Sequence, residues 1–205
     1  ESGWTEFRTA TLVVERLTAL GYEVKYGPEV HNREHMAGLP SEADLDRHLE
    51  RAIAQGANPE IASKMKGGYT GVVGILRCGE GPTVALRFDM DALDLTESAD
   101  PDHRPNREGF ASRNAGAMHA CGHDGHTAIG LGVATILAEM KDQLRGTVKL
   151  IFQPAEEGVR GAKAMVEAGV CDDVDYMLGA HLGFDAKETG TVVTGAGGFL
   201  ATSKM

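Results

Sequence analysis

The sequence predicts an α/β fold in which helices flank a largely parallel central sheet, arranged in layers. Apolar strands alternate with helical stretches along most of the chain, and this order is typical of parallel sheets. A length of 205 residues is enough for one domain with its own core. The 42% hydrophobic and 24% charged residues match an ordinary globular protein.

Helices are expected to come first along the chain. Apolar residues at helical spacing predict a helix over residues 4–20. Ser41 begins a second helix, because Ser-Glu-Ala-Asp resembles a capping box, and Gly56 marks its end. Asn58 and Pro59 are typical of the cap and first position of a short third helix.

Strands and helices then alternate. Apolar runs bounded by turn residues predict strands over 69–77, 83–89, 148–152, 176–181 and 191–194. Helical spacing predicts helices over 124–141 and 161–168. The polar stretch 97–117 is expected to be a long loop, and long loops within compact domains are often functional.

The charge and cysteine content exclude several classes of protein. A net charge of −10 argues against nucleic acid and anionic membranes as partners, because phosphate contacts need clustered Lys and Arg. No apolar run approaches the length of a membrane span. The three cysteines, 78, 121 and 171, are odd in number and irregularly spaced, which does not indicate a disulfide framework. A reducing cytoplasm is therefore the expected compartment.

Candidate functional residues lie where predicted strands end or helices begin, which is where open α/β sheets bind ligands. Cys121 and His123 are one residue apart, so in an extended loop both side chains would face the same metal. Thiolate and imidazole suit zinc and other late divalent metals. Gly122 and Gly125 would let the backbone approach the ion closely. The alternative is a glycine-rich turn with a buried cysteine and surface histidines.

Glu156 and Glu157 form an adjacent acidic pair after an apolar strand. Two neighbouring carboxylates repel each other unless a positive charge lies beside them. One could bind a metal while the other accepts a proton from water. The alternative is a solvated helix start, where the helix dipole favours acids.

The remaining candidates are weaker when taken alone. His181 ends a predicted strand, and a single histidine there is more often structural than a ligand. Asp89 and Asp91 close another strand, and each could hydrogen-bond a metal-bound histidine and fix its tautomer. The alternative is an ion pair with Arg87 at the end of the sheet.

As an ordered set, Asp-Met-Asp-Ala-Leu, His-Ala-Cys-Gly-His-Asp, Gln-Pro-Ala-Glu-Glu-Gly and Gly-Ala-His resemble the M20 metallopeptidase family, in its amidohydrolase branch. The resemblance covers nearly the whole chain and implies a zinc-peptidase-like catalytic domain. Glu156 matches the general base of the family, and Asp89 matches an aspartate that supports the ligands. Arg87 stands where many relatives outside this branch have a ligand histidine. Two divalent ions, Mn²⁺ or Zn²⁺, would be held by Cys121, His123, Glu157 and His181.

The resemblance also implies a substrate and partners. Residues 1–11 and 104–112 resemble relatives that act on aminobenzoyl-glutamate, so hydrolysis of p-aminobenzoyl-glutamate to p-aminobenzoate and glutamate is expected. Family members form homodimers or hetero-oligomers with a related subunit. Residues 1–205 would be the N-terminal part of the catalytic domain. The lid or dimerisation domain and a C-terminal catalytic segment with one more ligand histidine would lie outside this chain.

Other functions remain open at this stage. An N-acetyl or other N-acyl amino acid deacylase has the same reaction class, and the motifs do not separate the two. A catalytically inactive binding subunit of the same fold would have no chemical need for Glu156. A structural zinc domain needs four closed ligands and no base, which the acidic pair disfavours.

Overall fold

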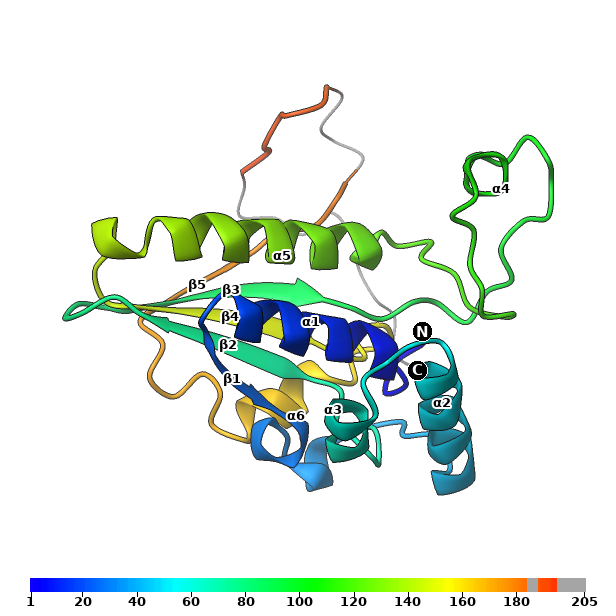
Figure 1. Ribbon diagram of the computed structural model, residues 1–205, viewed down its shortest axis with the longest axis horizontal. Coiled ribbons are helices and arrows are strands. Elements are labelled where there is room, and N and C mark those ends of the chain that lie inside the picture. The colour runs from blue at the N-terminus through cyan, green and yellow to red at the C-terminus, as the bar shows by residue number, and fades with distance from the viewer. Residues whose placement is uncertain (184–187, 195–205) are drawn as a thin grey trace.

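The computed structural model describes residues 1–183 and 188–194 and shows helices packed on a five-stranded sheet (Figure 1). The strand order across the sheet is β1-β2-β4-β3-β5. The strands are β1 (Glu23–Tyr26), β2 (Val72–Arg77), β3 (Thr83–Asp89), β4 (Thr147–Gln153) and β5 (Tyr176–Gly179). β3 is parallel to β4 and β5, whereas β2 is antiparallel to both β1 and β4. Every strand except β2 therefore runs in one direction, which confirms the predicted α/β sheet.

Alternation along the strands divides the core into two layers. In β2, Val72 and Leu76 pack into one cluster, whereas Val73 and Ile75 pack into the other. This follows from the period of two in an extended chain, which sends successive side chains to opposite faces. Both faces of the inner strands are thus buried under helices or loops, as expected for an α/β sheet.

Helices α1 (Phe7–Ala19) and α5 (His123–Glu139) cover one face of the sheet, and α6 (Ala162–Val166) lies on the other (Figure 1). Helices α2 (Glu42–Ala54) and α3 (Pro59–Lys64) pack beside α1. Short 3₁₀ turns, η1 (Gly27–Val30), η2 (Arg33–His35) and η3 (Lys141–Gln143), link these elements. Among the described residues, no helix is long and apolar enough to cross a membrane.

The predicted helix starts are confirmed at the level of single hydrogen bonds. The Ser41 hydroxyl accepts the backbone N–H of Asp44 at 3.2 Å and donates to the Asp44 carboxylate at 2.7 Å. The Asn58 side chain accepts the N–H of Glu60 at 3.0 Å. Each cap satisfies a backbone donor that has no partner inside its helix.

Three predictions about local structure were wrong or incomplete. The short edge strand β1 was not predicted, because its four residues alternate between exposed and half-buried positions and lack an apolar run. No strand forms over residues 191–194, where Val192 and Val193 are exposed and no neighbouring strand supplies hydrogen bonds. The predicted loop 97–117 contains the short helix α4 (Arg104–Glu108) and projects away from the sheet (Figure 1).

Candidate metal centre

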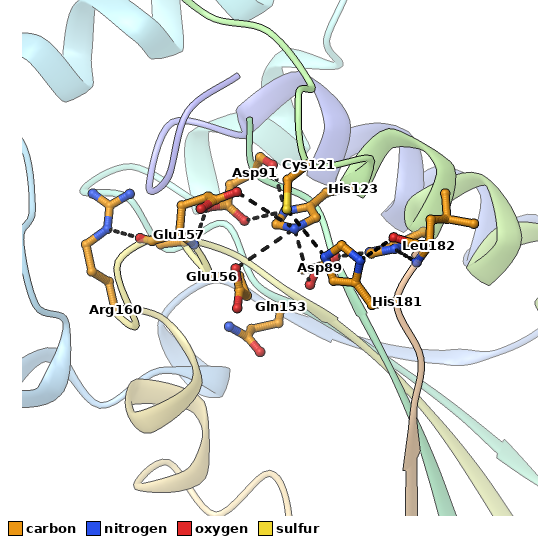
Figure 2. Close-up of polar contacts among 12 residues, drawn as sticks. Asp89, Asp91, Cys121, His123, Gln153, Glu156, Glu157, Arg160, His181 and Leu182 are labelled. Carbon is orange, nitrogen blue, oxygen red and sulfur yellow. Dashed lines mark hydrogen bonds and ion pairs between the residues drawn. The ribbon is translucent and has the colours of Figure 1, made fainter. Parts of the chain in front are cut away.

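The predicted site residues meet at one edge of the sheet. β3, β4 and β5 are parallel, so their carboxyl ends lie together. Asp91 follows β3, the acidic pair Glu156 and Glu157 follows β4, and His181 follows β5. The turn before α5 and the first residue of that helix add Cys121 and His123, so side chains from four separate segments converge (Figure 2).

His123 is the centre of this cluster and is completely buried. Its Nδ1 lies 2.9 Å from the Asp91 carbonyl oxygen and 3.3 Å from Asp91 Oδ1, two acceptors, so Nδ1 carries the proton. Nε2 then presents a lone pair toward Glu156 Oε2 at 3.9 Å and Glu157 Oε1 at 4.0 Å. Burial opposes protonation of His123, but its hydrogen bond to Asp91 and the surrounding carboxylates outweigh burial and raise its pKa.

Cys121 and His181 lie on the other side of His123. The Cys121 thiol sulfur is 3.4 Å from His181 Nε2, and the three residues can place ligand atoms within 4.8 Å of one another. Burial and then the nearby Glu157 carboxylate raise the pKa of the Cys121 thiol to about 11. Without a cation, the cluster therefore favours the neutral thiol over the thiolate.

Cys121 and His123 converge for a reason other than the predicted extended loop. Gly122 between them is left-handed, with a φ of 88°, and His123 already belongs to α5. A left-handed residue favours glycine because it lacks a Cβ. Gly125 has a different role from the one predicted, since a Cβ there would lie 2.5 Å from the Leu182 side chain. Its small size makes room for the segment that carries His181.

The acidic pair is half-exposed and held from below. The side chains of Glu156 and Glu157 are 37% and 22% exposed, and both lie within ligand distance of His123. Burial, followed by the Asp89 charge, raises the pKa of Glu156, and the Arg87 guanidinium partly offsets this shift. Asp91 Oδ2 accepts the backbone N–H of Glu157 at 2.9 Å.

Asp89 is fully buried and connects two other parts of the site. Its Oδ2 lies 2.6 Å from the Arg87 guanidinium, and its Oδ1 accepts from His126 Nδ1 at 2.5 Å. Burial opposes ionisation of Asp89, but the His126 hydrogen bond and the Arg87 charge prevail and lower its pKa. The ion pair with Arg87 therefore exists, and Asp89 also lies 3.7 Å from His123 Nε2.

His126 was not among the predicted site residues. Its Nε2 accepts the backbone N–H of Leu182 at 2.9 Å, so its Nδ1 carries the proton that it donates to Asp89. His126 thereby ties Asp89 at the end of β3 to the segment beyond β5. The signal was present in the sequence, because His123 and His126 are three residues apart and share one face of a helix.

The cluster has the properties of a cation site. His123 Nε2 and Glu157 Oε1 are buried and lack a hydrogen-bond partner among the described residues, which is costly for polar atoms. They lie 4.0 Å apart, which leaves room for one ion at about 2 Å from each. A thiol, imidazoles and carboxylates are the donors that zinc and manganese accept. The residues present therefore fit a bound divalent metal.

Comparison with known proteins agrees with this chemistry. Residues 85–197 match the model of peptidase family M20/M25/M40. The whole chain is 58% identical to one of the subunits of p-aminobenzoyl-glutamate hydrolase from Escherichia coli (strain K12) and 55% identical to indole-3-acetyl-aspartic acid hydrolase of Enterobacter agglomerans. It spans 47% of the length of each, so about half of these curated relatives.

Two solved structures share the fold. The aminobenzoyl-glutamate utilization protein of Klebsiella pneumoniae superposes with a TM-score of 0.74 at 45% identity, over 90% of this chain and 41% of that one. The YXEP protein of Bacillus subtilis, described as a dinuclear metal binding peptidase from the M20 family, gives 0.62 at 30% identity, over 88% and 38%. The matched motifs lie at the edge of the sheet where the acidic, imidazole and thiol groups meet. The chain belongs to peptidase family M20/M25/M40.

Proposed function

We propose that Cys121, His123, Glu157 and His181 hold divalent metal, with manganese or zinc as the ion. The observation that carries this proposal is the buried, unpartnered Nε2 of His123, which faces Glu157 on one side and lies beside Cys121 and His181 on the other. His123 belongs to every described group that could hold a metal, so two ions could share this cluster. A pair of ions also agrees with the dinuclear relative from Bacillus subtilis.

We further propose that the protein is an amidohydrolase in which Glu156 is the general base. When bound, divalent ions polarise an amide carbonyl and lower the pKa of a nearby water. The Glu156 carboxylate is the more exposed of the acidic pair and is placed to take the proton of that water. It then delivers the proton to the departing amine, which is a poor leaving group until it is protonated. The raised pKa of Glu156 suits both steps.

The substrate proposed for the whole protein is an N-acyl amino acid, with p-aminobenzoyl-glutamate as the first choice. The names of the two relatives share one chemistry, an aromatic acyl group joined by an amide to an acidic amino acid. The alternative is a deacylase for N-acetyl or other N-acyl amino acids. The curated relative from Escherichia coli is named as one of several subunits, which supports a homodimer or an assembly with a related subunit. The cytoplasm remains the proposed compartment.

The test separates the roles of the two glutamates in the complete reading frame that contains these residues. Glu156→Gln keeps the shape but removes the basic oxygen, so metal content should stay normal while turnover falls by about 100- to 10,000-fold. Glu157→Gln removes an anionic ligand, so metal content itself should fall. Hydrolysis of p-aminobenzoyl-glutamate is compared with that of N-acetyl amino acids. An inactive binding subunit predicts full metal content and no turnover of any substrate in the wild type.

Two outcomes would reject the assignment. The first is a Glu156→Gln protein that loses its metal, and the second is one that keeps normal turnover with full metal. If both glutamates are merely solvated, both substitutions will leave metal content and turnover unchanged.

A further inference from the structure

The turn that carries the acidic pair has an unusual backbone. Ala155, directly before Glu156, has a φ of 48°, in the left-handed region that residues with a Cβ disfavour. Ala155 is completely buried, so no solvent contact compensates for this conformation. Such a conformation persists only where the surroundings hold it in place, and such positions are common at functional sites.

Glu6 supplies one of the contacts that hold this turn. Its Oε1 accepts the backbone N–H of Ala155 at 2.8 Å, across a sequence separation of 149 residues. Its Oε2 lies 2.6 Å from the Thr70 hydroxyl. Glu6 precedes the first residue of α1 and is completely buried, and a buried carboxyl group is costly unless its polar atoms are satisfied.

The other end of the turn is held by a second buried carboxylate. Asp91 Oδ2 accepts the backbone N–H of Glu157, and Arg160 Nε donates to the Glu157 carbonyl at 2.7 Å (Figure 2). Hydrogen bonds to residues 155 and 157 therefore fix the backbone on both sides of Glu156. The direction of the Glu156 side chain depends on both attachments.

We propose that Glu6 is a positioning residue that, through the N–H of Ala155, sets the orientation of the Glu156–Glu157 pair toward His123. This inference rests on the proposed function for the roles of the two glutamates. Glu6 is too deeply enclosed to meet a substrate, since its side chain is engaged by Thr70 and Ala155. Its effect on the reaction is therefore indirect.

The hydrogen-bond arrangement predicts which substitution of Glu6 is tolerated. Glutamine keeps one oxygen for the Ala155 N–H and offers an amide donor to the Thr70 hydroxyl. That hydroxyl can accept, because its own proton can turn to the Gly68 carbonyl oxygen 3.5 Å away. Burial and then the Asp91 charge raise the pKa of Glu6 to about 8, so at neutral pH it is mostly the uncharged acid that glutamine resembles. Methionine fills a similar space but offers no acceptor.

The experiment compares Glu6→Gln with Glu6→Met in the complete reading frame. Metal affinity, kcat, KM, Tm and the exchange rate of the Ala155 amide are measured for each. Leu17→Ala is the control for lost stability, because Leu17 is buried in the core beneath α1 and has no contact with the site. Glu6→Gln should stay within about threefold of wild type in kcat, since its acceptor is kept. Glu6→Met should lose about 100-fold in kcat, weaken metal binding and expose the Ala155 amide to exchange.

The controls make the outcomes decisive. Leu17→Ala should lower Tm while kcat per folded molecule stays normal. The proposal is overturned if Glu6→Met keeps wild-type kcat and metal affinity, or if Glu6→Gln loses as much as Glu6→Met. If Glu6→Met does not fold, slow Ala155 exchange in wild type and Glu6→Gln supports the proposal, and rapid exchange in wild type overturns it. Inactivity of wild type would reject the proposed function, and Ala155 exchange and metal affinity would still test the role of Glu6.

Discussion

Replacing Asp91 with asparagine tests how the site depends on the groups behind its ligands. Asp91 is 1% exposed and accepts two hydrogen bonds, one at each carboxylate oxygen. Oδ1 faces His123 Nδ1 at 3.3 Å, and Oδ2 accepts the Glu157 N–H at 2.9 Å. Asparagine has one oxygen, so one of these two donors must face an NH₂ group instead. The substitution therefore disturbs a ligand on either side.

The expected size of the effect follows from these contacts. Leaving one buried donor unsatisfied costs about 1–3 kcal/mol. Loss of a carboxylate behind a metal-bound histidine weakens metal binding by about 10- to 100-fold. The two figures agree, because each factor of ten corresponds to about 1.4 kcal/mol. Asp91→Asn should thus bind Zn²⁺ about 10- to 100-fold more weakly than wild type.

Competition with a chromophoric chelator gives the Zn²⁺ affinity of wild type and variant directly. Asp94→Asn is the matched control, since Asp94 is exposed, lies three residues further along the chain and loses the same charge. It should bind Zn²⁺ as wild type does. An Asp91→Asn affinity within twofold of wild type would refute the role assigned to Asp91.

Three further outcomes are expected. Gly130→Ala should lower Tm, because its Cβ would lie 2.8 Å from ring atoms of Phe88 and Phe152; overpacking of about 1–3 kcal/mol outweighs a helix-propensity gain of about 1 kcal/mol, and a higher Tm would contradict this packing. The folded-state pKa of Glu6, about 8, lies above its ordinary value of 4.5, so the folded protein retains this proton. Its stabilisation is complete below pH 4.5 and is lost as pH rises to about 8, at about 1.4 kcal/mol per unit. Denaturant unfolding should show this slope in wild type and not in Glu6→Gln. The Cys121 thiol, with a pKa of about 11, must lose its proton to bind metal. Zn²⁺ affinity should therefore rise by up to about tenfold per pH unit below that value, and a pH-independent affinity would be inconsistent with thiolate ligation.

Sequence periodicity predicted those elements whose residues themselves carry the signal. The apolar stripe of α1 and the Ser41 cap of α2 are local features, so both were predicted close to their observed bounds. β1 depends on pairing with β2, from Glu23 opposite Ile75 to Tyr26 opposite Val72, and such pairing has no local signature. For the same reason, β-branched residues at 191–194 do not form a strand where no partner is present.

The site was predictable to a similar degree. The motifs pointed to Cys121 and His123, and the fold brings them to one edge of the sheet. The reason given for their convergence was wrong, because a left-handed Gly122 and the start of α5 replace the extended loop. Glu6 had no distinguishing signal, since an acidic residue at a helix start is ordinarily explained by the helix dipole. Its contact with Ala155 exists only in the folded chain.

The central claim is that Cys121 is a metal ligand within this cluster, and X-ray absorption at the Zn edge tests it most directly. The Zn²⁺-loaded protein should show sulfur scattering at about 2.3 Å together with nitrogen or oxygen at about 2.0–2.1 Å. Cys121→Ser should remove the sulfur shell, whereas Cys78→Ser, which alters another half-buried cysteine, should leave it intact. A spectrum without sulfur in wild type, or an unchanged sulfur shell in Cys121→Ser, would contradict this account of the metal centre.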